Sequence, residues 1–235
     1  GNKVIDSLNV TWYYNWGTKD ESTPSREYVP MAWGKKAADP ENVATYITKD
    51  NVTHFLSFNE PDNKDQSNIP VANTVEPYTN LLSMGYRMGS PATTEGQATK
   101  WLTDFINQAD NEKQRVDFIA IHWYDWGGWF QNKQTEPDPE KVFKRFKAYI
   151  DKVYNIYHKP IWITEFNSNK NTTEATELAF MKLALPYLES DDRVERYAYF
   201  FPSNLLPVQN GKLTPIGKLY QEFKSTPSLK ANITE

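Results

Sequence analysis

Two glutamates each close an apolar, β-rich stretch of the chain. Glu60 follows residues 55–59, and Glu165 follows residues 161–164. A charged carboxyl beside hydrophobic residues is costly unless it is paired or used. A single glutamate of this kind could be no more than a solvated strand end, whereas two in the same setting favour a function.

Cleavage of a glycosidic bond commonly uses two carboxyl groups as catalytic groups. One protonates the leaving oxygen while the other supports the anomeric carbon as it becomes oxocarbenium-like. If the two are about 5 Å apart, the second attacks directly and the anomeric configuration is retained. Their surroundings must differ, so that one carboxyl stays protonated and the other ionised.

Aromatic residues could supply the binding surface for such a substrate. They make up 14% of the chain, including 8 Trp and 14 Tyr. Some of these rings must fill the core, but a ring can also pack against the C–H face of a sugar. We expect the stretch Trp126-Gly127-Gly128-Trp129-Phe130 to be a loop whose exposed rings form a substrate platform. Further candidates for substrate contact are Trp12, Tyr14, Trp16, Trp33 and Phe200.

The elements that position these residues alternate along the chain. Apolar or β-rich runs predict strands at 10–14, 28–33, 54–58, 86–90, 116–123, 161–164 and 196–201. Helical periodicity predicts helices at 39–47, 78–82, 101–109, 138–153, 180–188 and 214–223. Repeated strand–helix alternation predicts a parallel α/β fold, in which active-site residues lie at the carboxyl ends of the strands. An open doubly wound sheet is the alternative, although the Gly-rich phosphate turn of its nucleotide-binding forms is absent.

Composition excludes several other classes of function. The net charge of −4 and the lack of a basic stripe argue against a nucleic-acid partner. The chain has no cysteine, which excludes disulfides and thiolate metal sites. With only 3 His, of which His54 and His158 show no partner pattern, neither a His-based metal site nor a cofactor is expected. No apolar run is long enough to span a membrane.

Five motifs follow one another between about residues 10 and 201: Tyr14-Asn15-Trp16-Gly17, Pro30-Met31-Ala32-Trp33-Gly34, Phe58-Asn59-Glu60-Pro61-Asp62, His122-Trp123-Tyr124 and Trp162-Ile163-Thr164-Glu165-Phe166. Asn-Glu-Pro alone occurs in many retaining glycosidases, but the whole series is more specific. It resembles glycoside hydrolase family 128, whose members have a (β/α)8 catalytic core and act on β-1,3-glucans.

This resemblance implies a fold. Residues 1–235 would form one catalytic (β/α)8 TIM barrel in which Glu60 ends strand four and Glu165 ends strand seven. Strand two would then be short or degenerate and lie in the polar stretch 17–26. We also expect a monomer that is secreted or lies at the cell surface or in the periplasm, since a chain of this length without cysteine is compatible with export. The first residues lack the apolar core of a signal peptide, so export cannot be read from them.

The resemblance also implies the roles of individual residues. Glu60 would be the acid/base and Glu165 the nucleophile of a retaining, endo-acting hydrolase of laminarin-type β-1,3-glucan. Asn59 would bind the sugar 2-hydroxyl, although an Asn here could simply form a turn. Tyr124 would donate to Glu165, and His122 would contact substrate or a neighbouring carboxylate unless it is a core histidine.

Two other functions stay open. A glycosidase of the same clan could use these glutamates on another β-glycan, such as a β-xyloside, because the fold alone does not fix the substrate. A non-catalytic β-glucan-binding barrel would be expected to have lost one of the two glutamates, and both are present.

Overall fold

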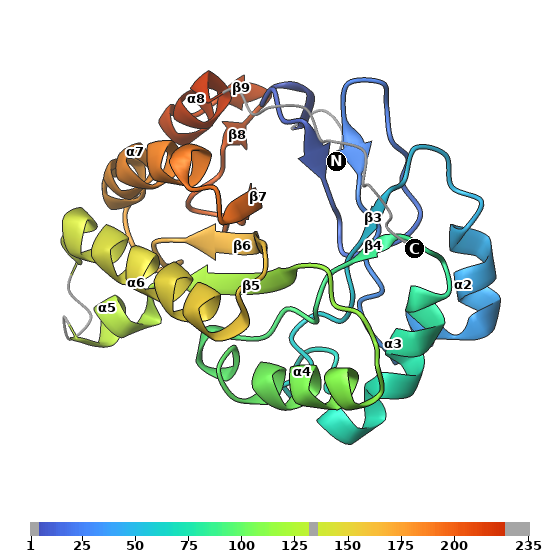
Figure 1. Cartoon of the computed structure of the whole chain (residues 1–235). Coiled ribbons are helices and arrows are strands. Elements are labelled where there is room, and N and C mark those ends of the chain that lie inside the picture. Colours follow the sequence, from blue (N-terminus) through green and yellow to red (C-terminus); the bar gives the residue numbers. More distant parts are fainter. Residues whose placement is uncertain (1–4, 132–135, 224–235) are drawn as a thin grey trace. The chain divides into compact units, whose positions relative to one another are not determined.

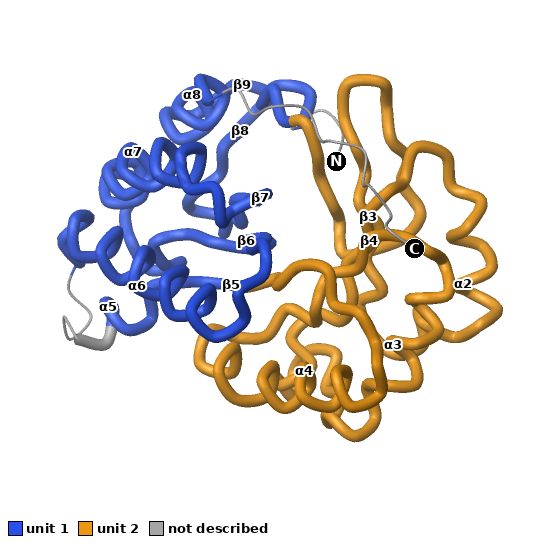
Figure 2. Tube along the Cα trace, viewed as in Figure 1, with its two compact units in different colours: residues 1–10, 122–226 blue, residues 11–121, 227–235 orange. Residues whose placement is uncertain are grey.

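The computed structural model describes residues 5–131 and 136–223, apart from the side chains of Phe130 and Gln131. The chain has a mixed α/β fold made of two compact units (Figure 2). In described residues, unit 1 comprises 5–10, 122–131 and 136–223, and unit 2 comprises 11–121. The chain passes from unit 2 to unit 1 within strand β5 (Ile119–Tyr124). The organisation of residues 1–235 as a single domain stays a prediction.

Unit 2 is built on short parallel strands at the predicted places. Strand β1 (Trp12–Tyr13) pairs with β2 (Glu27–Tyr28), and β3 (His54–Phe55) pairs with β4 (Arg87–Met88). Beyond these strands the parallel pairing continues as single bridges, Met31 with Leu56 and Gly89 with Phe118. The strands are shorter than predicted partly because Pro30, which has no N–H to donate, interrupts the segment after β2.

Helices separate these strands, again where periodicity predicts them. They are α2 (Pro40–Tyr46), α3 (Val75–Leu82) and α4 (Trp101–Asn111), with 3-10 turns η1 (Lys35–Ala38), η2 (Val71–Asn73) and η3 (Glu95–Gln97). Each α-helix buries its apolar stripe. On α4 that stripe consists of Leu102, Phe105, Ile106 and Ala109, as the sequence predicts.

Unit 1 contains the longest strands and helices. Strands β5, β6 (Ile161–Asn167) and β7 (Val194–Tyr199) form one sheet in that order, with β6 and β7 parallel. Its helices are α5 (Trp126–Gln131), α6 (Pro139–Tyr157), α7 (Glu174–Ser190) and α8 (Pro215–Glu222), and α6 and α7 lie side by side (Figure 1). The core between them is aromatic, with Phe146 contacting Trp123, Phe166 and Phe180.

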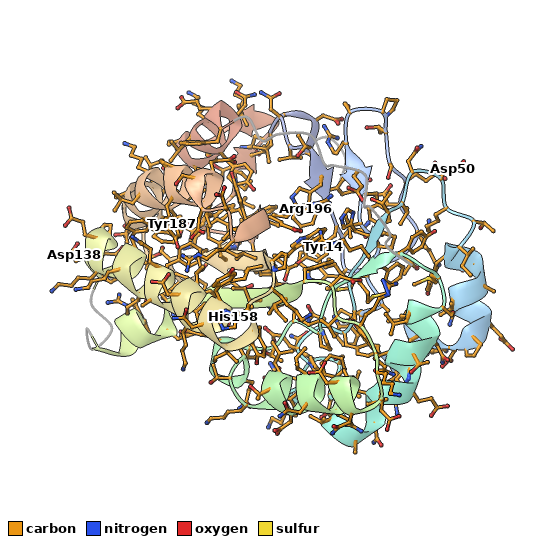
Figure 3. The ribbon with its side chains drawn as sticks, viewed as in Figure 1. Tyr14, Asp50, Asp138, His158, Tyr187 and Arg196 are labelled. Carbon is orange, nitrogen blue, oxygen red and sulfur yellow. The ribbon has the colours of Figure 1, made fainter. Side chains whose placement is uncertain are left out.

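Helix α6 shows how the sequence sets both ends of an element (Figure 3). At its start the Asp138 carboxylate accepts a hydrogen bond from the Glu140 N–H at 3.0 Å, and Pro139 occupies the first turn. At its end His158 adopts a left-handed conformation, and its N–H donates to the Tyr154 carbonyl at 2.8 Å. The predicted start at Asp138 is confirmed, and the helix runs four residues beyond the predicted end at 153.

The prediction of a degenerate strand in residues 17–26 is wrong. The only pairing there is one antiparallel bridge between Thr23 and Arg26, and β1 pairs directly with β2. Glu60 therefore follows the third strand of the described residues and Glu165 lies in the sixth. The antiparallel pair β8 (Val208–Gln209) and β9 (Lys212–Leu213) was not predicted. Pairings among the described residues do not form a closed barrel, so barrel closure stays a prediction.

Within residues 5–131 and 136–223, no helix combines the length and apolar character that crossing a membrane requires.

The turn between β6 and α7 is fastened by a buried carboxyl. Oε2 of Glu177 accepts hydrogen bonds from the Ser168 N–H at 2.8 Å and from the Ser168 hydroxyl, while its Oε1 has no hydrogen-bond partner among the described residues. Burial raises the pKa of Glu177 from 4.5 to about 7, although the hydrogen bonds from Ser168 act in the opposite direction.

We expect this raised pKa to make the fold less stable as pH rises. Between about pH 4.5 and 7 the folded chain keeps a proton on Glu177 that the unfolded chain has lost, so stability falls through this window by up to about 3 kcal/mol. Glu177→Gln keeps an acceptor for Ser168 and never ionises. Urea unfolding at pH 5 and pH 8 should therefore show a smaller loss in this variant. The exposed Glu174→Gln is the control, and equal pH dependence in Glu177→Gln and wild type would contradict the assignment.

Gly217 lies where α8 touches the chain before it. A Cβ built there would be 1.9 Å from the Pro207 carbonyl oxygen, a backbone atom that itself accepts from the Thr214 N–H at 3.0 Å. Space therefore requires glycine at this position.

Gly217→Ala should destabilise the fold by about 1–3 kcal/mol, towards the upper end because backbone must move. Thermal unfolding should show a midpoint lowered by about 2–4 °C for each kcal/mol lost. Gly96→Ala is the matched control, since an added Cβ there meets nothing within 4 Å. A midpoint in Gly217→Ala as high as in Gly96→Ala would show that the contact is not tight.

Candidate active site

Glu165 lies in the best-buried strand of the sheet. All seven residues of β6 are buried, and Glu165 itself is only 7% exposed. Between the pairs Ile163–Tyr197 and Phe166–Tyr199, β6 has one more residue than β7. This β-bulge falls on Thr164 and Glu165, and a bulge bends the strand and re-aims a side chain. The local irregularity is thus located at the predicted nucleophile.

Two side chains of β5 contact the Glu165 carboxylate. The Tyr124 hydroxyl donates a short hydrogen bond to Oε2 of Glu165, which is the contact that the resemblance implies. Nδ1 of His122 lies 3.5 Å from the same oxygen and forms an ion pair with it when the imidazole is protonated. His122 and Tyr124 share one face of the strand because they are two residues apart. Together they fix the orientation of the carboxylate.

Phe200 lies against this group. Its ring meets Tyr124 edge-on, with centroids 5.9 Å apart and planes at 73°. Its backbone is tied to the end of β6, since the Asn167 side chain donates to the Phe200 carbonyl at 2.8 Å. In unit 1 the structure thus brings together His122, Tyr124, Glu165 and Phe200.

Glu60 is held by an unusual backbone. Its φ of 40° lies in the left-handed region, which residues other than glycine and asparagine rarely adopt. Its N–H donates to the Ala92 carbonyl at 2.7 Å, and its own carbonyl accepts from Asn63 at 3.0 Å. The Asn63 side chain also donates to Oε2 of Glu60 at 3.1 Å. The turn and the Asn63 amide thus help to orient this half-buried carboxyl.

Asn59 is buried beside Glu60. Its N–H donates to the Trp33 carbonyl at 3.0 Å, and its side-chain amide donates to Gln66 at 3.2 Å. Its Oδ1 is buried and has no hydrogen-bond partner among the described residues. An acceptor of this kind is rare in a folded protein and suits a ligand hydroxyl.

The aromatic candidates of unit 2 include two exposed rings. Trp16 is 38% exposed and Trp33 39%. The Tyr14 ring, itself half-buried, lies 5.0 Å from that of Trp16. Trp16 has a φ of 56°, and the turn around it is held by the Tyr28 hydroxyl, which lies 2.8 Å from Oδ1 of Asn15 and 2.6 Å from the Gly17 carbonyl. Trp16 and Trp33 are thus exposed aromatic side chains, of the kind that can pack against a sugar.

The predicted loop at residues 126–130 is instead the helix α5, so this expectation is wrong. Its two glycines cost about 2 kcal/mol of helix propensity relative to alanine, which is why the sequence resembles a loop. The helix forms because Asp125 accepts hydrogen bonds at its start, from the Gly128 N–H to Oδ1 at 3.2 Å and from the Trp129 N–H to its carbonyl at 3.1 Å. Trp126 is 37% exposed and Trp129 partly exposed, while the Phe130 side chain lies outside the described residues.

Several residues near the site were not predicted from the sequence. Asn63 had a signal, since it continues the Asn59–Asp62 motif by one residue. Arg145 has the helical spacing of a solvated residue, yet it forms an ion pair with Asp125. His54 shows no partner pattern in the sequence, yet the fold brings its Nδ1 to 3.1 Å from Oε1 of Glu27.

Comparison with known proteins gives the chain a family. A family model described as the glycosyl hydrolase catalytic core matches residues 2–220. Among curated proteins, alkali-sensitive linkage protein 1 of Schizosaccharomyces pombe is 30% identical over 236 residues, covering 90% of this chain and 40% of the relative. The chain spans less than half the length of the curated relatives it matches.

Solved structures agree. A subgroup I endo-β-1,3-glucanase of glycoside hydrolase family 128 from Amycolatopsis mediterranei, in complex with laminarihexaose, is 26% identical with a TM-score of 0.81, covering 94% of this chain and 93% of the other. A curdlan-specific exo-β-1,3-glucanase of subgroup III from Blastomyces gilchristii, in complex with glucose, is 28% identical with a TM-score of 0.77, covering 95% of each chain. The chain therefore belongs to the glycosyl hydrolase catalytic core family, and its resemblance to glycoside hydrolase family 128 is confirmed.

Proposed function

We propose that this chain hydrolyses β-1,3-glucan by a retaining mechanism, with Glu165 as nucleophile and Glu60 as acid/base. The observation that carries the proposal is the buried Glu165 carboxylate, which accepts a hydrogen bond from Tyr124 and lies 3.5 Å from His122. Burying a charge is costly, and this cost is accepted where the group has a task. Membership of a glycoside hydrolase family supports cleavage of a glycosidic bond as that task.

The chemistry has two steps. In the first, Glu60 gives its proton to the glycosidic oxygen while Glu165 attacks the anomeric carbon, so that a covalent glycosyl ester forms and the leaving sugar departs. In the second, Glu60 takes a proton from water, which displaces Glu165 from the anomeric carbon and restores its carboxylate. Two inversions give net retention. This route requires carboxyls about 5–5.5 Å apart.

The substrate contacts that we propose involve one buried acceptor and several exposed or partly exposed rings. The buried Oδ1 of Asn59 accepts from the sugar 2-hydroxyl, a bond that strengthens as the transition state forms. The exposed rings Trp16, Trp33 and Trp126 pack against glucosyl faces. Tyr14, Trp129 and Phe200 line these subsites as partly exposed neighbours.

The finer features of the proposal follow from the relatives. Two solved relatives above 25% identity are β-1,3-glucanases, one of them endo-acting and bound to laminarihexaose. We propose endo action here, on a chain folded as a closed (β/α)8 barrel and working as a monomer. Since a glucan polymer does not enter a cell, the place of action is extracellular or at the cell surface. Exo action is the second candidate, because the exo-acting relative is also 28% identical.

Hydrolysis of laminarihexaose followed by NMR tests activity, stereochemistry and cleavage mode together. We expect the β-anomer of the newly formed reducing end to appear first, since retention conserves the configuration. Early products should be di-, tri- and tetrasaccharides. Release of glucose alone would replace endo with exo action, first appearance of the α-anomer would exclude retention, and absence of any cleavage would refute the proposed substrate.

The roles of the two glutamates can be separated with azide. Glu60→Ala and Glu165→Ala should each lower kcat by about 10²- to 10⁴-fold or more while leaving the fold intact. With an activated aryl β-glucoside, whose leaving group departs without a proton, azide should restore Glu60→Ala through a β-glycosyl azide, because Glu165 still forms the ester. In Glu165→Ala it should yield the α-glycosyl azide by direct attack. The exposed Glu222→Ala is the control, and reversed anomers would exchange the two assignments.

A further inference from the structure

Helix α5 is tied to α6 by an ion pair that the catalytic proposal does not use. The Asp125 carboxylate is 1% exposed, and Arg145 on α6 donates to it from Nε and from Nη2, each at 2.6 Å. A two-pronged contact of this kind fixes the direction of the carboxylate as well as its distance. The same carboxylate accepts from the Gly128 N–H, so one group holds both helices.

Gly128 brings α5 directly against this ion pair. A Cβ built at Gly128 would lie 2.0 Å from Nη2 of Arg145 and 2.0 Å from Oδ2 of Asp125. Any side chain would therefore push the pair apart. A Cβ at the preceding Gly127 meets nothing within 4 Å. A side chain therefore fits at Gly127 but not at the neighbouring Gly128.

The residue that this arrangement holds in place is Trp126. It follows Asp125 directly and lies two residues beyond Tyr124, which donates to Glu165. Its ring is 37% exposed, and Nζ of Lys170, from the turn after β6, lies 5.7 Å from the ring centroid. The Trp126 side chain is thus partly exposed, and its backbone directly follows the residue of the ion pair.

We propose that the Asp125–Arg145 ion pair is a positioning device that holds the Trp126 ring as a binding surface for a glucosyl unit, and thereby sets a preference for longer glucan chains. This proposal rests on the proposed function of the chain. A six-residue helix with two glycines does not hold its own shape, so the orientation of its first ring depends on outside contacts. A ring fixed in its binding orientation loses little freedom when the sugar stacks on it.

The decisive variants are Arg145→Lys and Gly128→Ala. Lysine keeps the charge but lacks the planar fork, and the alanine methyl separates the pair while both charges remain. Both should raise KM for laminarihexaose about tenfold, with kcat within twofold and a much smaller effect on laminaritriose. Trp126→Ala should do the same. Gly127→Ala is the matched control and should leave KM within twofold of wild type.

A double-mutant cycle distinguishes positioning of the Trp126 ring from a nonspecific disturbance of the fold. If Arg145 acts through Trp126, adding Arg145→Lys to Trp126→Ala should change KM no further. An additional tenfold rise in the double variant would overturn the proposal, as would an unchanged KM in both Arg145→Lys and Gly128→Ala. Circular dichroism and thermal unfolding confirm that each variant is folded.

NMR of the tryptophan indole N–H groups gives a readout that does not depend on activity. The Trp126 signal, assigned by its loss in Trp126→Ala, should shift or broaden in Arg145→Lys and Gly128→Ala but not in Gly127→Ala. A signal that stays in place in the first two would refute the positioning role even in an active enzyme. If the wild type cleaves no laminari-oligosaccharide, the proposed function and this substrate preference fail together, whereas shifted signals would still support the structural link.

Discussion

A carboxylate taken out of water must be met by hydrogen-bond donors or lose its charge, and unit 1 is organised around this constraint. Among its described residues it buries three carboxyls, and the contacts of each are different. Glu165 accepts from Tyr124 and lies near His122, Asp125 is paired with Arg145, and Glu177 accepts from Ser168. Because several kcal/mol are at stake for each buried ion, the sheet and helices must hold the donors in register.

The same burial makes these contacts effective. Apolar side chains of β6, α6 and α7 exclude water around the sheet, and a hydrogen bond is stronger where the local dielectric is low. Glu60 has a different environment in unit 2, half-buried in a turn and bound by the Asn63 amide. The retaining mechanism that we propose needs carboxyls with unlike surroundings, one that gives a proton and one that attacks. The sequence separates the two glutamates into such surroundings by setting one within a strand and the other beyond a strand end.

Much of this could be predicted from sequence because periodicity reports burial. All seven predicted strands and all six predicted helices correspond to elements, and the start of α6 was readable from Asp138 and Pro139. Contacts between side chains that are distant in the sequence could not be predicted in this way. Arg145 has the spacing of a solvated helix residue, and only the fold brings it to Asp125. Helix α5 was not predicted because the low helix propensity of its two glycines disfavours a helix. Its stability comes from tertiary contacts, which the local sequence does not report.

Backbone conformation separates ordinary turns from the candidate site. Apart from asparagine, which tolerates a left-handed backbone, four residues other than glycine have positive φ among those described: Trp16, Glu60, Lys113 and His158. Lys113 and His158 follow the ends of α4 and α6, where this conformation is the common way to end a helix.

Trp16 and Glu60 end no helix, and each follows a strand. Such a conformation costs of order 1–3 kcal/mol and persists only where the surroundings impose it. Both residues were selected from the sequence, which does not report backbone conformation. That the strain falls on them is an independent reason to place the active site there, because a fold free of functional demands would relax it by using glycine.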